Sequence, residues 1–210
     1  MSIVQNPIMG QMRKSFANVN TYVHKGQNVV SSKAFIRKNM NSDLQKAQRA
    51  SFKLISDMYQ SIGGFINIGF PVRPEKQSSY NYFMSLNLPN AIDNSGEVPV
   101  INYSLLQISK GSLPGVNVLS ATVTADGISL DCESCFGYGM NAASDDQITV
   151  LCRTGNGALY FAKQLRGTEP ECQLVLTVPS VAKENIEFVY AFVTSADGKK
   201  ASNSVFVPLT

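Results

Sequence analysis

The chain has 210 residues and a formal net charge of +3, from 18 Lys and Arg against 15 Asp and Glu. Apolar residues make up 44% of the sequence and charged residues only 16%. Such a chain can bury a hydrophobic core, which excludes a disordered protein, a coiled coil and a collagen-like fibre.

The N-terminal part of the chain is basic. Residues 1–60 hold nine basic and two acidic side chains, whereas the remaining 150 residues hold nine basic and thirteen acidic ones. We call residues 1–60 the basic head. Three interpretations are open: its charges are simply solvated, it contacts a protein partner or a second copy of the chain, or it binds nucleic acid. No basic run exceeds two residues, which argues against nucleic acid. The candidate interaction residues of this head are Arg13, Lys14, Lys25, Arg37, Lys38, Lys46, Arg49 and Lys53.

No export signal or membrane span is visible. Residues 1–10 have neither a basic n-region nor an apolar h-region, so we expect a protein made in the cytoplasm without such a signal. No apolar run approaches the roughly 18–20 residues that cross a bilayer. The single histidine, His24, argues against most His-dependent catalysis and is expected on the surface.

A β-hairpin is the first predicted element. Residues 16–23 and 28–35 are predicted strands on either side of the turn Lys25-Gly26-Gln27. A two-stranded ribbon buries little surface by itself. We therefore expect the rest of the chain, or a neighbouring subunit, to cover it.

Two helices are predicted next. Ser42 and Gln45 fit a capping box, and the Gly63-Gly64 pair ends the helix that Ser42 opens. Its predicted apolar stripe consists of Leu44, Ala47, Leu54, Ile55, Met58 and Ile62. Residues 65–70 form a short apolar segment, residues 78–87 a second helix, and residues 98–109 an extended segment. Within the second helix Tyr80, Tyr82 and Phe83 are an aromatic cluster, which forms either a protein interface or ordinary core.

The C-terminal part of the chain is predicted to consist of β-strands. Seven strand-like runs are predicted at residues 118–124, 128–132, 148–153, 158–163, 172–178, 186–194 and 202–207. Asp-Gly and Asn-Gly turns separate three pairs of them. The fold class is therefore mainly β (α+β): a basic arm, hairpin and helical region over residues 1–114, then an immunoglobulin- or fibronectin-like β-sandwich over residues 115–210.

Four cysteines are the main candidate for a metal or redox site; the acidic pair Asp145-Asp146 could bind calcium only weakly, because the oxygen-rich spacing of a calcium loop is absent. Cys132 and Cys135 form a C-x-x-C, but Cys152 and Cys172 lie 20 residues apart, whereas structural zinc usually takes two close pairs. A loop follows Cys135, where a thioredoxin-like pair would precede a helix. We expect four thiols without metal or cofactor; a disulfide, a zinc site and redox catalysis are the alternatives. The acidic pair Asp145-Asp146 is expected in a solvated loop.

Several segments resemble an uncharacterised family of Bacteroidota proteins of similar length. They are Gln48-Arg49 with Phe52, residues 65–70, Tyr103-Ser104 leading to residues 109–113, and residues 195–207. The resemblance implies a domain of unknown function and no catalytic residues. The chain departs from the family where residues 39–42 replace a Pro-Arg-Thr type turn, and the Cys132–Cys135 pair is not a family feature.

These observations favour a non-enzymatic structural or assembly protein. No catalytic constellation is present, and the basic head and acidic remainder suit a head-to-tail contact between copies. A component of a phage virion or tail-like particle fits this description. The alternative is a β-sandwich module whose loops, including residues 136–146, bind a glycan or a protein.

Overall fold

The computed structural model describes residues 2–4, 14–33, 41–96, 98–124, 127–137, 141–179 and 185–209. The chain divides into two compact units, unit 1 (Met1–Ser42) and unit 2 (Asp43–Thr210). The boundary expected at residues 114/115 lies inside unit 2.

Unit 1 contains a single antiparallel sheet. Its strands are β1 (Ser2–Val4), β2 (Lys14–Phe16), β3 (Val19–His24) and β4 (Gln27–Ser32), in the order β1-β4-β3-β2. The expected β3–β4 hairpin is confirmed, and its turn residues Lys25 and Gly26 both have positive φ. His24, at the end of β3, is exposed as expected.

The sheet of unit 1 has four strands where two were expected. The predicted first strand is broken by a tight turn at Ala17-Asn18, so that Phe16 pairs with Val19. This turn explains why apolar residues do not alternate across that segment. Strands β1 and β2 have three residues each, too few to give a periodic signal.

Unit 2 opens with three helices. They are α1 (Asp43–Ile62), α2 (Phe65–Gly69) and α3 (Ser79–Asn87), and both predicted helices are confirmed. Helix α1 begins directly after Ser42, and Gly63 follows its last turn with φ of +59°. The Ser78 side chain caps α3 by accepting a hydrogen bond from the Asn81 amide at 3.1 Å.

The apolar stripe of α1 is only partly correct. Ile55, Met58 and Ile62 are buried, but Leu44 is 85% exposed in the first turn. Of the expected extended segment, Val100–Ile101 forms β6, which pairs with β5 (Ile92–Asp93). The residues around this two-stranded ladder are irregular and lead from the helices to the C-terminal strands.

All seven predicted C-terminal strands are present in unit 2. They are β7 (Asn117–Val123), β8 (Gly127–Glu133), β9 (Gln147–Thr154), β10 (Leu159–Leu165), β11 (Glu171–Thr177), β12 (Ile186–Thr194) and β13 (Val205–Phe206). They form an antiparallel sheet of order β11-β8-β7 and a second of order β10-β9-β12-β13. The described protein is therefore mainly β, as expected.

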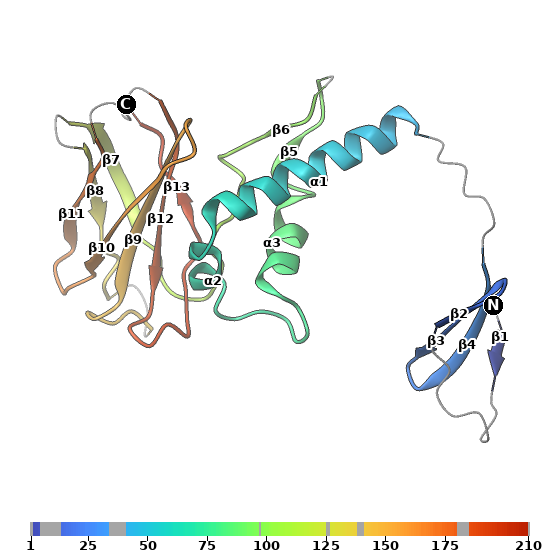
Figure 1. The fold of residues 1–210 in the computed structure, drawn as a ribbon. Coiled ribbons are helices and arrows are strands. Elements are labelled where there is room, and N and C mark those ends of the chain that lie inside the picture. Colours follow the sequence, from blue (N-terminus) through green and yellow to red (C-terminus); the bar gives the residue numbers. More distant parts are fainter. Residues whose placement is uncertain are drawn as a thin grey trace. The chain divides into compact units, whose positions relative to one another are not determined.

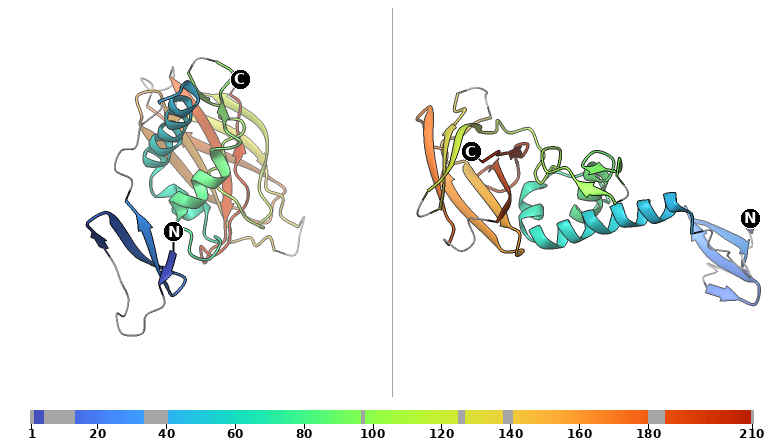
Figure 2. Two further views of the ribbon diagram at one scale, coloured as in Figure 1. Left: turned by 90° about the vertical axis from the view of Figure 1, so that its right-hand side faces the viewer. Right: turned by 90° about the horizontal axis from the view of Figure 1, so that it is seen from above.

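The two sheets and the helices of unit 2 form three layers (Figure 1). One hydrophobic core lies between the sheets, and a second lies between the four-stranded sheet and helices α1 to α3. The right-hand view of Figure 2 also shows the helices on the side of this sheet away from β7 and β8.

Strand β12 shows how the middle layer is built. Val189, Ala191 and Val193 belong to the core between the sheets, whereas Phe188, Tyr190 and Phe192 belong to the core beneath the helices. Every side chain from residue 188 to 194 is buried. A strand that is covered on both faces needs a continuous apolar sequence rather than an alternating one.

Candidate functional site

The basic residues predicted as an interaction surface are divided between the two units. In unit 1, Lys14 and Lys25 are exposed on β2 and in the β3–β4 turn. Arg13, Arg37 and Lys38 lie outside the described residues. Over its 42 residues unit 1 has six basic and no acidic side chains, whereas unit 2 has twelve basic and fifteen acidic ones.

The other three basic candidates are exposed on helix α1: Lys46, Arg49 and Lys53. Lys46 pairs with Asp43 at 2.9 Å between Nζ and Oδ1, on a surface where such a pair contributes little stability. Phe52 on the same helix is 47% exposed. This outward surface of α1 therefore combines positive charge with exposed apolar side chains.

The aromatic candidates on α3 are part of the core beneath the helices. Phe83 is fully buried, and the Tyr80 and Tyr82 rings are half-buried at its edge. Tyr80 packs edge-on against Tyr59, and Tyr82 packs edge-on against Phe70, with ring centroids 5.0 and 5.3 Å apart. Phe83 is inaccessible within unit 2, and a partner contact through the exposed edges of the two tyrosines stays a prediction.

Three of the segments that carry the family resemblance, residues 65–70, 109–113 and 195–207, meet at one hydrogen-bonded junction. The buried Ser109 hydroxyl bridges the carbonyl oxygens of Gly69 and Ser202, at 3.0 and 2.6 Å. The Ile108 amide donates to the Ser204 hydroxyl at 3.1 Å. A Cβ on Gly69 would lie 2.3 Å from the carbonyl oxygen of Ile108, so the close approach requires glycine.

A groove of about 390 Å³ lies beside this junction. Its lining includes the Tyr82 ring, the apolar Val72, and two exposed lysines, Lys110 and Lys200. A second hollow of about 280 Å³ involves the loop expected to bind ligands, with Asp145 and Asp197 among its lining residues. Residues 138–140 of that loop lie outside the described residues.

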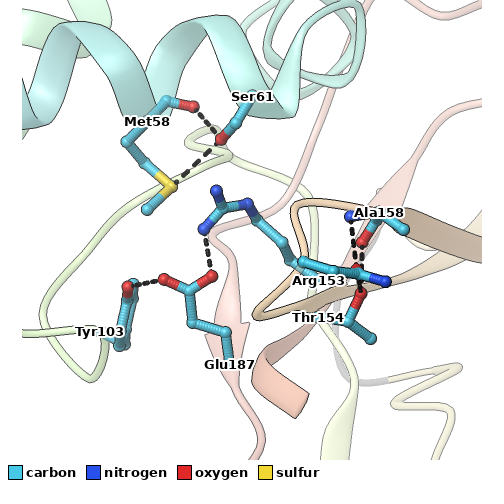
Figure 3. Close-up of polar contacts among 8 residues, drawn as sticks. Met58, Ser61, Tyr103, Arg153, Thr154, Ala158 and Glu187 are labelled. Carbon is cyan, nitrogen blue, oxygen red and sulfur yellow. Dashed lines mark hydrogen bonds and ion pairs between the residues drawn. The ribbon is translucent and has the colours of Figure 1, made fainter. Parts of the chain in front are cut away.

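A polar cluster joins the connector of the helical layer to the sandwich (Figure 3). The Glu187 carboxylate accepts a hydrogen bond from the Tyr103 hydroxyl and pairs with the Arg153 guanidinium. Burial and the contact with Glu187 raise the pKa of Tyr103, which keeps its hydroxyl neutral as a donor. Both carboxylate oxygens are thus occupied, an arrangement that suits anchoring rather than proton transfer.

The acidic pair Asp145-Asp146 corrects the sequence analysis in one respect. Asp145 is exposed, but Asp146 is buried and lies 3.7 Å from the Nε of Arg166, which is also buried. Arg166 also donates to the carbonyl oxygen of Pro114. Sequence reasoning missed Arg166 because a lone arginine between Leu165 and Gly167 is typical of an exposed turn.

The cysteines come together in a way that the C-x-x-C spacing did not predict. Cys132 on β8 lies directly opposite Cys172 on β11, and both side chains belong to the core between the sheets. Cys135 follows β8, whereas Cys152 is buried on β9. All four are free cysteines. In the part of the chain that the structure describes, no group of three or more His, Cys, Asp or Glu side chains could hold a metal ion.

The fold and these features define a mainly β protein with a helical layer and a separate cationic sheet. The chain belongs to a family of unknown function (DUF6266), whose profile matches residues 11–208. This confirms the expected uncharacterised family, while the Bacteroidota origin stays an expectation. Neither the curated proteins nor the solved structures gave a match. No described helix is long and apolar enough to cross a membrane.

Proposed function

We propose that the protein is a non-enzymatic assembly protein whose unit 1 docks on a partner protein, foremost a second copy of the chain. One observation carries this proposal. Of the side chains described in unit 1, Val29 alone is buried, although the unit contains a four-stranded sheet. A sheet is stable when a second layer covers its apolar face, and a neighbouring copy can supply that layer.

Charge complementarity supports a second copy as the partner. Unit 1 has no acidic side chain, and the outer surface of the β11-β8-β7 sheet carries Asp131, Glu133 and Glu171. A contact between different surfaces of two copies is heterologous, so it can propagate into a ring or a filament. Opposite charges would set the register and the rate of association, and apolar burial would supply most of the affinity.

The test compares the full chain with two double variants that change charge equally. Lys14→Glu/Lys25→Glu alters unit 1, and Lys76→Glu/Lys163→Glu alters exposed lysines of unit 2 as the control. Analytical ultracentrifugation over a concentration and salt series should show self-association that weakens with salt and is lost in the first variant alone. A full chain that is monomeric at every concentration, or equal loss in both variants, contradicts the proposal.

We further propose that the assembly is a phage virion or tail-like particle. The support is the head-to-tail contact proposed above, because a heterologous contact between copies can repeat along a particle. Mass spectrometry of particles purified from the producing cells should find this chain at a stoichiometric level. Its absence from every such particle contradicts this part of the proposal.

We also propose that the two sheets form an immunoglobulin- or fibronectin-like sandwich. The support is the strand order: β7, β8 and β11 make one sheet, and β9, β10, β12 and β13 make the other. The chain thus crosses between the sheets after β8, β10 and β11, as in Greek-key sandwiches. A solution structure with one continuous sheet through β10 and β11 would contradict it.

The second candidate is a module that binds a glycan or a protein. The groove beside the junction favours it, because it offers a tyrosine ring and two lysines in one hollow. A glycan array, read for Tyr82→Ala and for the exposed control Tyr22→Ala, would test this function. Binding lost in the first variant alone supports it, and no binding by the parent chain contradicts it.

A further inference from the structure

The strongest feature outside the proposed contact is the thiol cluster at one end of the β11-β8-β7 sheet. Cys132 and Cys172 are partners in the β8–β11 register, and both side chains face the core between the sheets. Residues that are opposite on antiparallel strands have Cα atoms about 4.5–5.5 Å apart. A disulfide spans Cα separations of about 4.4–6.8 Å, so the backbone need not move to bridge this pair.

The two thiols already interact. The proximity of the two sulfurs lowers the pKa of Cys172 and, together with burial, raises that of Cys132. The two sulfurs thus differ in character: Cys172 is the better thiolate, and Cys132 retains the proton. This asymmetry suits a pair in which one sulfur attacks first and the other resolves the intermediate.

A buried cation supports the thiolate. The Arg166 side chain is fully buried, and its Nη1 has no hydrogen-bond partner among the described residues. Its charge helps to lower the pKa of Cys172, whereas at Cys135 burial outweighs this charge and raises the pKa. A buried guanidinium with unused hydrogen-bonding capacity is costly, and it is better satisfied when an anion forms beside it.

Cys172 is the accessible member of the pair, because its side chain is half-buried whereas Cys132 is 1% exposed. A hollow of about 290 Å³ is lined by Cys132 and Cys172 together with Asp131 and Gln173. Cys152 provides an internal contrast, because it lies on β9 with no exposed surface, and burial raises the pKa of its thiol to about 11. Exposure and thiolate character together decide which cysteine reacts.

We propose that Cys132 and Cys172 form a reversible cross-strand disulfide by exchange with a low-molecular-weight disulfide. The Cys172 thiolate attacks one sulfur of that disulfide, forming a mixed disulfide and releasing one thiolate. The Cys132 sulfur, on losing its proton, then attacks the Cys172 sulfur and releases the second thiolate. The dithiol is oxidised to the protein disulfide, and the small disulfide is reduced to two thiols.

The test uses the full chain, reduced and then incubated with oxidised glutathione before acid quenching and alkylation. Peptide mapping should find Cys132 joined to Cys172, with Cys135 and Cys152 alkylated. Closing a loop of about 40 residues should raise the melting temperature by roughly 5–15 °C, reversibly on reduction. The exchange should accelerate as the pH rises through the pKa of Cys172 and level off above it.

Single variants separate the roles of the four cysteines. Cys172→Ser should abolish the exchange, Cys132→Ser should leave a mixed disulfide on Cys172, and Cys152→Ser should change nothing. Cys172 should react with an aromatic disulfide reagent at least about tenfold faster than Cys152. Four alkylatable thiols after incubation, or a bridge from Cys132 to Cys135, overturns the proposal, and the parent chain decides this even if a variant does not fold.

Discussion

The stability of the sandwich without the helical layer is a direct test of the three-layer architecture. We compare a fragment of residues 43–210, which is the whole of unit 2, with one of residues 115–210. The shorter fragment lacks helices α1 to α3 and the connector that carries Tyr103 and Ser109. It therefore removes the cover from one face of the four-stranded sheet.

The expected loss follows from four side chains. Leu151, Phe188, Tyr190 and Phe192 are at most 2% exposed, and all belong to the core beneath the helices. Burying one such side chain contributes about 1.5–3 kcal/mol, so exposing four costs roughly 6–12 kcal/mol, an upper range because unfolded chains also bury surface. The Tyr190 hydroxyl also loses its acceptor, the carbonyl oxygen of Tyr103 at 2.5 Å.

This loss is comparable to the whole stability of a typical domain, which is about 5–15 kcal/mol. We expect the 43–210 fragment to melt cooperatively and to give dispersed amide resonances in NMR. The 115–210 fragment should be largely unfolded or aggregated under the same conditions. A soluble 115–210 fragment whose melting temperature lies within a few degrees of the longer one would refute the reasoning and support an autonomous sandwich domain.

Three substitutions test individual positions of unit 2. The Thr149 hydroxyl is buried and has no hydrogen-bond partner among the described residues, so Thr149→Val should raise the stability by about 1 kcal/mol. The control Thr154→Val should lower the stability, because the Thr154 hydroxyl donates to Asn156 and Ala158. Asp146→Ala leaves the buried Arg166 unpaired and should cost about 3–5 kcal/mol in chemical denaturation, while Asp145→Ala on the exposed neighbour should cost less than about 0.5 kcal/mol. In Gly111→Ala the new Cβ would lie 2.1 Å from the carbonyl oxygen of Ala201. We therefore expect the free energy of unfolding, measured in thermal melts, to fall by about 1–3 kcal/mol. An unchanged melting temperature would contradict this close approach.

Local signals in the sequence predicted most elements of unit 2. Turn residues with positive φ, such as Gly157 and Gly198, separate strands at the expected places. The serines at positions 42 and 78 mark the starts of α1 and α3. These signals depend on only a few neighbouring residues, so they can be recognised in the sequence without knowledge of the tertiary structure.

Features that depend on topology could not be predicted in the same way. The pairing of Cys132 with Cys172 requires β8 and β11 to be neighbours, and that order follows from the sheet rather than from spacing. The presence of a layer that covers the second face of β12 could, by contrast, have been predicted from the sequence. Residues 186–194 are nearly all apolar, and a strand with one solvated face would alternate instead.

The residues that carry the family resemblance have a structural explanation. Gly69 and Gly111 allow two backbone segments to approach closely, and Ser109 and Ser202 satisfy buried polar groups at the same junction. A motif of this kind specifies how the helical layer joins the sandwich, and it would persist whatever the protein binds. The groove beside the junction and the cationic sheet of unit 1 lie outside these structural requirements, so variation in function is expected there. The same reasoning makes the thiol pair informative, because the packing of two antiparallel strands does not itself require two cysteines at opposite positions.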